Sequence, residues 1–191
     1  MTILKPTLAA FFMSAAFGAI AAPVTYTIDP THTTASYSVN HLGLSLQQGT
    51  FSEVSGRLIV DEAAGTGKVE VVVPTATLNS HFAKRDEHLK GADFFDVARY
   101  PEMRYIADKV VFRQGKPERV EGQLMLKGVT RPLTLAVTRA ARLANPMSGV
   151  ETWGVNAEGR LKRSEFGMSK YLPGVGDEVT LAIALEAPKA Q

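Results

Sequence analysis

The chain has 191 residues, with 21 Lys and Arg against 19 Asp and Glu, and it contains no cysteine. Charges of both signs are interspersed, without a basic stripe or tail, which argues against nucleic acid as a partner. The lack of cysteine excludes a disulfide framework, a thiolate metal site and a cysteine nucleophile, so packing alone must hold the fold together.

Residues 1–21 have the features of a cleavable export signal. Lys5 supplies a positive charge, an apolar run follows over residues 8–20, and Ala19 and Ala21 bracket Ile20 in the A-x-A pattern of signal-peptidase sites. The apolar run, about 15 residues, is shorter than the ~20 residues that span a bilayer. We therefore expect cleavage after Ala21 and a soluble mature chain, residues 22–191, that forms one domain in the periplasm.

Alternating apolar and polar residues predict β-strands along most of the mature chain. The clearest runs are residues 36–41, 69–73, 103–107, 133–138 and 179–185. Turn residues separate these runs, and we count about eight strands longer than about five residues. This pattern predicts an all-β fold in which an eight-stranded antiparallel meander closes into a barrel, because closure removes exposed sheet edges.

One short helical insertion is expected at roughly residues 79–90, where good helix formers replace the alternation. Asn79 or Ser80 can cap its start, and Gly91 suits its end. Phe94 and Phe95 follow this helix. They belong either to the core or to the mouth of the barrel, if the helix closes one end of it.

The last predicted strand carries small side chains on one face, including Ala182 and Ala184. Small residues that face inward would leave room inside a barrel. The alternative is that they pack beneath the helix or a neighbouring loop.

Common catalytic signatures are absent from the sequence, which has no G-x-S-x-G, no H-E-x-x-H and no Walker loop. The chain has four histidines: His32, His41, His81 and His88. They lack the close ligand spacing of known zinc sites, so we predict no metal and no cofactor. Asp86, Glu87 and His88 are adjacent helix positions that point to different sides, so we predict no acid–base pair there.

Several segments occur in an order and spacing typical of one family: residues 29–33, 37–43, 85–90, 93–97, 100–101, 120–124, 126–132, 163–167 and 176–179. Through them the mature chain resembles the YceI-type family, bacterial proteins described as polyisoprenoid-binding, with a lipocalin-like barrel. Two positions depart slightly from the usual pattern of the family. Thr33 stands where the family often has Ser, and Tyr26 fills the place of a large aromatic residue ahead of the Asp-Pro pair.

The resemblance implies an eight-stranded lipocalin-like barrel whose apolar cavity holds a polyprenyl chain, a quinone-like lipid or a fatty amide. It also suggests a homodimer, and it brings no catalytic residue. The polar positions of the family motifs are His32, His41, Arg85, Asp86, His88 and Arg163. Together with the strand pattern, the resemblance predicts ligand contacts from Phe82, Leu89, Phe94, Phe95, Tyr105, Phe166, Ala182 and Ala184.

The leading functional hypothesis is a periplasmic binding protein that carries or stores a long apolar lipid. The alternatives are an enzyme that acts on a lipid in the same cavity and a structural stress-response protein. Lipid extracted from the protein would separate the binding protein from the structural protein. Turnover of that lipid would separate the enzyme from the binding protein.

Overall fold

The computed structural model describes residues 22–61 and 63–191, so the predicted export signal lies outside the described residues. Strands dominate this part of the chain: β1 Val24–Thr27, β2 Thr34–His41, β3 Ser45–Phe51, β4 Ser55–Asp61, β5 Thr66–Pro74, β6 Glu102–Arg113, β7 Lys116–Leu126, β8 Val129–Ala144, β9 Glu151–Lys162 and β10 Val175–Pro188. The helical elements are α1 Ala83–Lys90 and the 3-10 helices η1 Thr75–Thr77 and η2 Arg163–Phe166.

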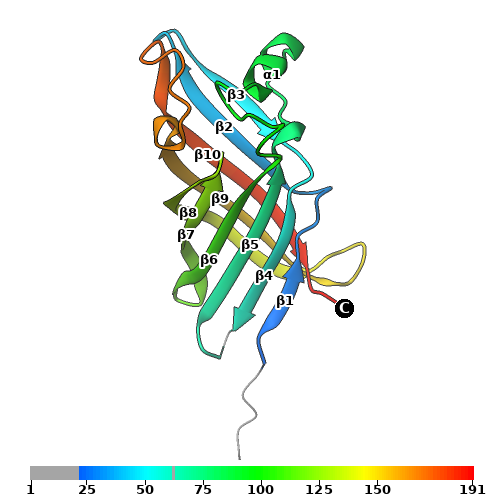
Figure 1. The fold of residues 1–191 in the computed structure, drawn as a ribbon. Helices are drawn as coiled ribbons and strands as arrows, with labels where there is room; N and C mark the ends of the chain where they lie inside the picture. The colour runs from blue at the N-terminus through cyan, green and yellow to red at the C-terminus, as the bar shows by residue number, and fades with distance from the viewer. Residues whose placement is uncertain (1–21, 62) are drawn as a thin grey trace, which may run out of the picture.

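These strands form one antiparallel sheet that curls into a half-barrel (Figure 1). Strands β4 to β10 follow one another as a meander, β10 then pairs with β2 and β2 with β3, and β1 lies beside β4. The all-β antiparallel architecture is therefore confirmed. The expected number of eight strands is wrong, because the sheet has ten strands among the described residues.

Two strands explain why the alternation of apolar and polar residues predicted too few strands. Strand β1 has four residues, too few for a clear period of two. Strand β3 follows β2 after a three-residue turn and has its pattern inverted, because Gln47 and Phe51 line the interior while Leu46 is 64% exposed. A strand that puts a leucine outside and a glutamine inside does not match the template of a half-buried strand.

Both edge strands of the sheet have partners. Tyr26 on β1 forms an antiparallel bridge with Lys189, just after the end of β10. Thr50 on β3 forms a bridge with Asn79, which precedes α1. These short pairings cover part of each edge and so limit edge-to-edge association.

The helix is shorter than expected and begins at Ala83. Residues before it are extended because Asn79 bridges to Thr50 on β3, and His81 has a positive φ of 65°. Neither Asn79 nor Ser80 caps the helix, whose N-cap position is Phe82 without a side-chain hydrogen bond. Gly91 is the C-cap, as the sequence predicts.

The core follows the concave side of the sheet in three apolar clusters. The first centres on Tyr105, Leu124 and Phe166, the second on Tyr26, Leu58 and Leu185, and the third on Ala35, Phe51 and Leu78. Partly buried strand residues such as Val71 contact all three clusters. The core is thus a wall around an interior space.

Candidate functional site

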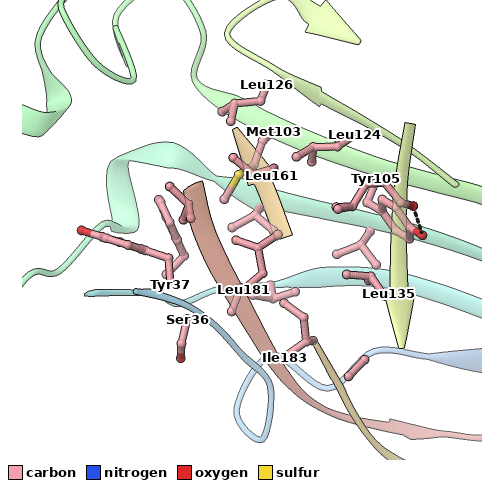
Figure 2. A pocket seen from close by; sticks show the side chains of 18 of the residues that line it. Ser36, Tyr37, Met103, Tyr105, Leu124, Leu126, Leu135, Leu161, Leu181 and Ile183 are labelled. Atoms are coloured by element: carbon pink, nitrogen blue, oxygen red, sulfur yellow. Dashed lines mark hydrogen bonds between the residues drawn. The ribbon is translucent and has the colours of Figure 1, made fainter. Parts of the chain in front are cut away.

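A cavity with a volume of about 570 Å³ lies inside the half-barrel. Aliphatic and aromatic side chains from β2 through β10, and from α1 and the segment after it, make up most of its wall. Figure 2 shows Met103, Leu124, Leu161, Leu181 and Ile183, from four strands, gathered around this space. Pockets for small ligands have volumes of ~300–1,000 Å³, so the cavity is large enough to be a binding site.

Alternation along β10 decides which of its side chains reach the cavity. Leu181, Ile183 and Leu185 line it, whereas Ala182 and Ala184 are exposed on the outer face. Neither alternative for the two alanines holds, because they do not line the cavity and, being exposed, they are not packed beneath the helix or a loop. The strand buries its large aliphatic side chains, since they gain the most from leaving water, and the small residues are left outside.

Small residues do face the interior from other strands. Ala35 on β2 and Ala157 on β9 line the cavity and are 8% and 5% exposed. Ala157 lies opposite Ile183 in the register of β9 and β10. The rest of the cavity volume comes from the curvature of the sheet, because the diameter of a curled sheet grows with its number of strands.

Tyr105 on β6 lines the cavity and keeps its polar end bonded to the wall. Its hydroxyl lies 3.0 Å from the carbonyl oxygen of Leu133 and 3.1 Å from that of Val120, and these two acceptors share its single proton. Burial raises the pKa of Tyr105 well above its usual range. A Cβ at Gly122 would come within 2.7 Å of Cζ of Tyr105, so the glycine makes room for the ring. The cavity therefore meets mainly the apolar ring of this tyrosine.

We call the end of the cavity at α1 the mouth, because His41, His88 and Tyr171 line the cavity there and are exposed. An aromatic group forms one side of this mouth. The His88 ring on α1 lies 5.2 Å from the Phe94 ring and 5.8 Å from the Tyr171 ring, and the last two are 6.3 Å apart. All three residues line the cavity. Leu89 and Phe95 also line it.

Arg85 brings a positive charge to the same mouth. Its guanidinium donates to the hydroxyl and the carbonyl oxygen of Ser80 and, over 3.3 Å, to the side-chain oxygen of Gln47 on β3. Both Arg85 and Gln47 line the cavity. Nearby Tyr37 also lines it, and burial raises the pKa of Tyr37. The motif arginine thus ties α1 to the β2–β3 hairpin.

Asp86 does not line the cavity but fixes the segment that positions Arg85. Its carboxylate accepts hydrogen bonds from the Ser80 N–H at 2.7 Å and the Ser80 hydroxyl at 2.5 Å. Burial pushes the pKa of Asp86 up, yet these hydrogen bonds and the positive charges of Lys90 and Arg85 together outweigh it, and the net pKa is lowered. The geometry supports a positioning role through Ser80.

Arg163 is 5% exposed and binds backbone rather than an acidic partner. Its guanidinium donates to the carbonyl oxygens of Gly176 and Val175, each at 2.8 Å, and of Met168. Burial lowers the pKa of Arg163. Because Arg163 also lines the cavity, it joins the wall to the start of β10 and to the loop ahead of it.

Three other predicted site residues lie away from the cavity. Phe82 is 56% exposed at the start of α1, and Phe166 is buried in a core cluster without lining the cavity. His32 is exposed and pairs with Asp29 at 2.8 Å. His41, at the end of β2, does line the cavity.

The sequence prediction missed several lining residues: Tyr37, Gln47, Met103, Leu161, Tyr171 and Leu181. Strand alternation separated the two faces of β10 without showing which one is inner, and it gave no signal for Tyr171, which lies in a loop. Within residues 22–61 and 63–191, no three His, Cys, Asp or Glu gather as metal ligands. No helix in that part of the chain has the length and apolar character to cross a membrane.

The motif order seen in the sequence corresponds to a family model. The model of the YceI-like domain matches residues 26–187, from β1 to the end of β10. The chain belongs to the YceI-like family. The resemblance inferred from the ordered motifs is therefore confirmed.

Relatives match over nearly the whole chain. The YceI protein of Escherichia coli O157:H7 is 32% identical over 178 residues, which cover 93% of this chain and 92% of that protein. The YceI protein of Salmonella arizonae is 31% identical over 169 residues, covering 88% and 87%.

Solved structures share the fold. The Campylobacter jejuni YceI protein is 27% identical, with a TM-score of 0.67 over 80% of this chain and 90% of that one. Burkholderia cenocepacia BcnA is 21% identical, with a TM-score of 0.69 over 84% and 99%. A polyisoprenoid binding domain from Saccharophagus degradans, implicated in plant cell wall breakdown, is 16% identical, with a TM-score of 0.66 over 87% and 99%. The last two similarities show a common fold only.

Proposed function

We propose that this YceI-like protein binds one long apolar lipid chain inside the half-barrel. The observation that carries the proposal is the cavity of about 570 Å³ with its largely apolar wall. Aliphatic side chains from several strands surround the space, as Leu124, Leu161 and Leu181 do in Figure 2. Such a wall attracts apolar groups without directional contacts.

The energetics favour a long occupant, because the gain grows with the apolar surface that the ligand buries. Each buried methylene-sized group gains ~0.8 kcal/mol, and association costs ~4–15 kcal/mol. About 5 to 19 such groups only offset that cost, so tight binding requires a chain longer than this.

The polar end of the lipid is proposed to lie at the mouth. Arg85 and Gln47 are hydrogen-bonded there, and His88 packs near Tyr171. Tyr171 and His41 line one small recess beside the cavity. These groups can donate hydrogen bonds to a head group while the apolar tail lies among Tyr105, Leu181 and their neighbours. Phe94, Phe95 and Leu89, which line the cavity near the mouth, are the proposed contacts of the first part of the tail.

An isoprenoid tail is the proposed ligand class. The Saccharophagus degradans domain, which has the same fold, is described as polyisoprenoid-binding. We place the protein in the periplasm as a carrier or reservoir, after removal of residues 1–21, because these residues have the features of an export signal. The proposed role is binding without chemical conversion of the lipid.

The test is mass spectrometry of protein purified from the cells that make it. Native spectra should show one added mass per chain, and solvent extraction should release a lipid of that mass with a long hydrocarbon tail. A protein without bound lipid that also takes up none from a mixture of polyprenols and isoprenoid quinones would refute the proposal.

A further inference from the structure

Three leucines protrude from the hairpin that joins β2 to β3. Leu42, Leu44 and Leu46 are 60%, 81% and 64% exposed. Single exposed leucines are common, but three within five residues of one hairpin form a patch of the kind that marks an interaction site. Leu46 belongs to this patch because it points outward from β3.

A second segment extends this apolar surface. The loop before β10 touches the hairpin, because the Leu42 N–H donates to the Gly174 carbonyl oxygen at 2.7 Å. In the same loop Tyr171 is 54% exposed and Leu172 is 37% exposed. Figure 1 shows the hairpin and this loop together at one end of the half-barrel. The mouth patch is defined as Leu42, Leu44, Leu46, Tyr171 and Leu172.

The mouth patch is continuous with the entrance of the cavity. Leu42 and Tyr171 line a small recess with His41 and Val175. Of these four residues, His41, Tyr171 and Val175 also line the main cavity. A lipid that enters or leaves by this route would therefore pass over the patch.

The composition of both segments suits contact with lipid. Residues 40–51 contain no Asp, Glu, Lys or Arg, and residues 166–175 contain Lys170 as their one charged residue. Lys170 is half exposed, with its ammonium 3.3 Å from Asp93, and its long stem can keep that charge at a polar surface. Tyrosine beside leucines is typical of the boundary between head groups and acyl chains.

The size of the patch argues against a stable protein partner. Standard protein interfaces use ~20–30 residues on each side, and five side chains on a protruding turn supply far fewer. A bilayer accepts such a protrusion because it needs no complementary shape.

We propose that the mouth patch docks the protein on the surface of a lipid bilayer, with Leu42, Leu44 and Leu46 inserted among the head groups. This inference rests on the proposed function, since docking would let the bound lipid pass between bilayer and cavity without crossing water.

The test is co-flotation of the mature, cell-processed protein with vesicles of phosphatidylethanolamine and phosphatidylglycerol. Leu44→Ser with Leu46→Ser removes two patch leucines that do not line the cavity. The matched control is Leu143→Ser with Met147→Ser, which removes apolar side chains that are 55% and 98% exposed. Both belong to the β8–β9 hairpin, which lies away from the β2–β3 hairpin (Figure 1). We expect the patch variant to lose at least about tenfold in vesicle affinity and the control less than about twofold.

Native mass spectrometry and size-exclusion chromatography of the same samples separate the possible failures. A parent protein that carries lipid but does not float with vesicles overturns the docking inference and leaves the proposed function standing. A parent dimer that the patch variant alone converts to monomer, with vesicle binding unchanged, also overturns it, because a second copy then covers the patch. A parent without lipid refutes the proposed function, whatever the flotation result.

Discussion

Ala157→Phe should block the cavity from inside. Ala157 is 5% exposed, lines the cavity and faces Ile183 across the β9–β10 pair. The phenyl ring adds about six carbons, each of which displaces a methylene-sized group of ligand that gains ~0.8 kcal/mol on burial. The total loss is about 5 kcal/mol, which corresponds to a Kd more than about a thousandfold higher. Long chains should lose more affinity than short ones.

Ala182→Phe is the matched control, because Ala182 lies on the neighbouring strand but on the exposed outer face. Native mass spectrometry should show the lipid mass in the parent and in Ala182→Phe, and its loss in Ala157→Phe. Thermal unfolding must show that Ala157→Phe still folds; overpacking would cost ~1–3 kcal/mol if the ring met the wall instead of the cavity. A folded Ala157→Phe protein with undiminished lipid would refute the reasoning.

Three further predictions concern the scaffold. Arg163→Met should lower the free energy of unfolding in urea by about 3 kcal/mol or more, because three carbonyl oxygens lose their buried donor; Arg160→Met, at a side chain that is 71% exposed, should have little effect. Tyr105→Phe should cost about 1 kcal/mol in thermal unfolding and keep the lipid in native spectra, since only the hydroxyl bonds to the wall are lost; loss of the lipid would contradict this. Hydrogen bonds from His32 and from Thr31 lower the pKa of Asp29 to about 2, and the bond to Asp29 raises the pKa of His32 above 6.5. NMR titration should show both shifts, and Asp29→Asn should abolish that of His32. Stabilisation by Asp29 is lost as the pH falls through about 2, and that by His32 is lost as the pH rises through its raised pKa.

Local features of the sequence were enough for the fold class. Alternation over residues 103–107 and 179–185 predicts strands that the structure contains within β6 and β10. Gly91 marks the end of α1 correctly. These features depend on neighbours along the chain, so they survive without knowledge of the tertiary structure. The order of the family motifs carried the assignment to the YceI-like family in the same way.

Distant pairings decided what the local pattern left open. Helix α1 begins at Ala83, later than the sequence predicts, because Asn79 pairs with Thr50, which lies 29 positions earlier in the chain. The mouth joins Gln47, Arg85 and Tyr171 from a strand, a helix and a loop that are far apart in the chain. The spacing of these residues along the sequence does not show that they lie together in the fold.

The sequence by itself determined that β10 has two faces, one with large aliphatic residues and one with Ala182 and Ala184. Only the tertiary structure decided that the aliphatic face is the inner one and that Leu46 on β3 lies outside. The physical reason is that a shift of one residue in register exchanges the two faces of a strand. The choice between them follows from the burial gained by the whole curled sheet, which is a property of all its pairings together and of no single strand.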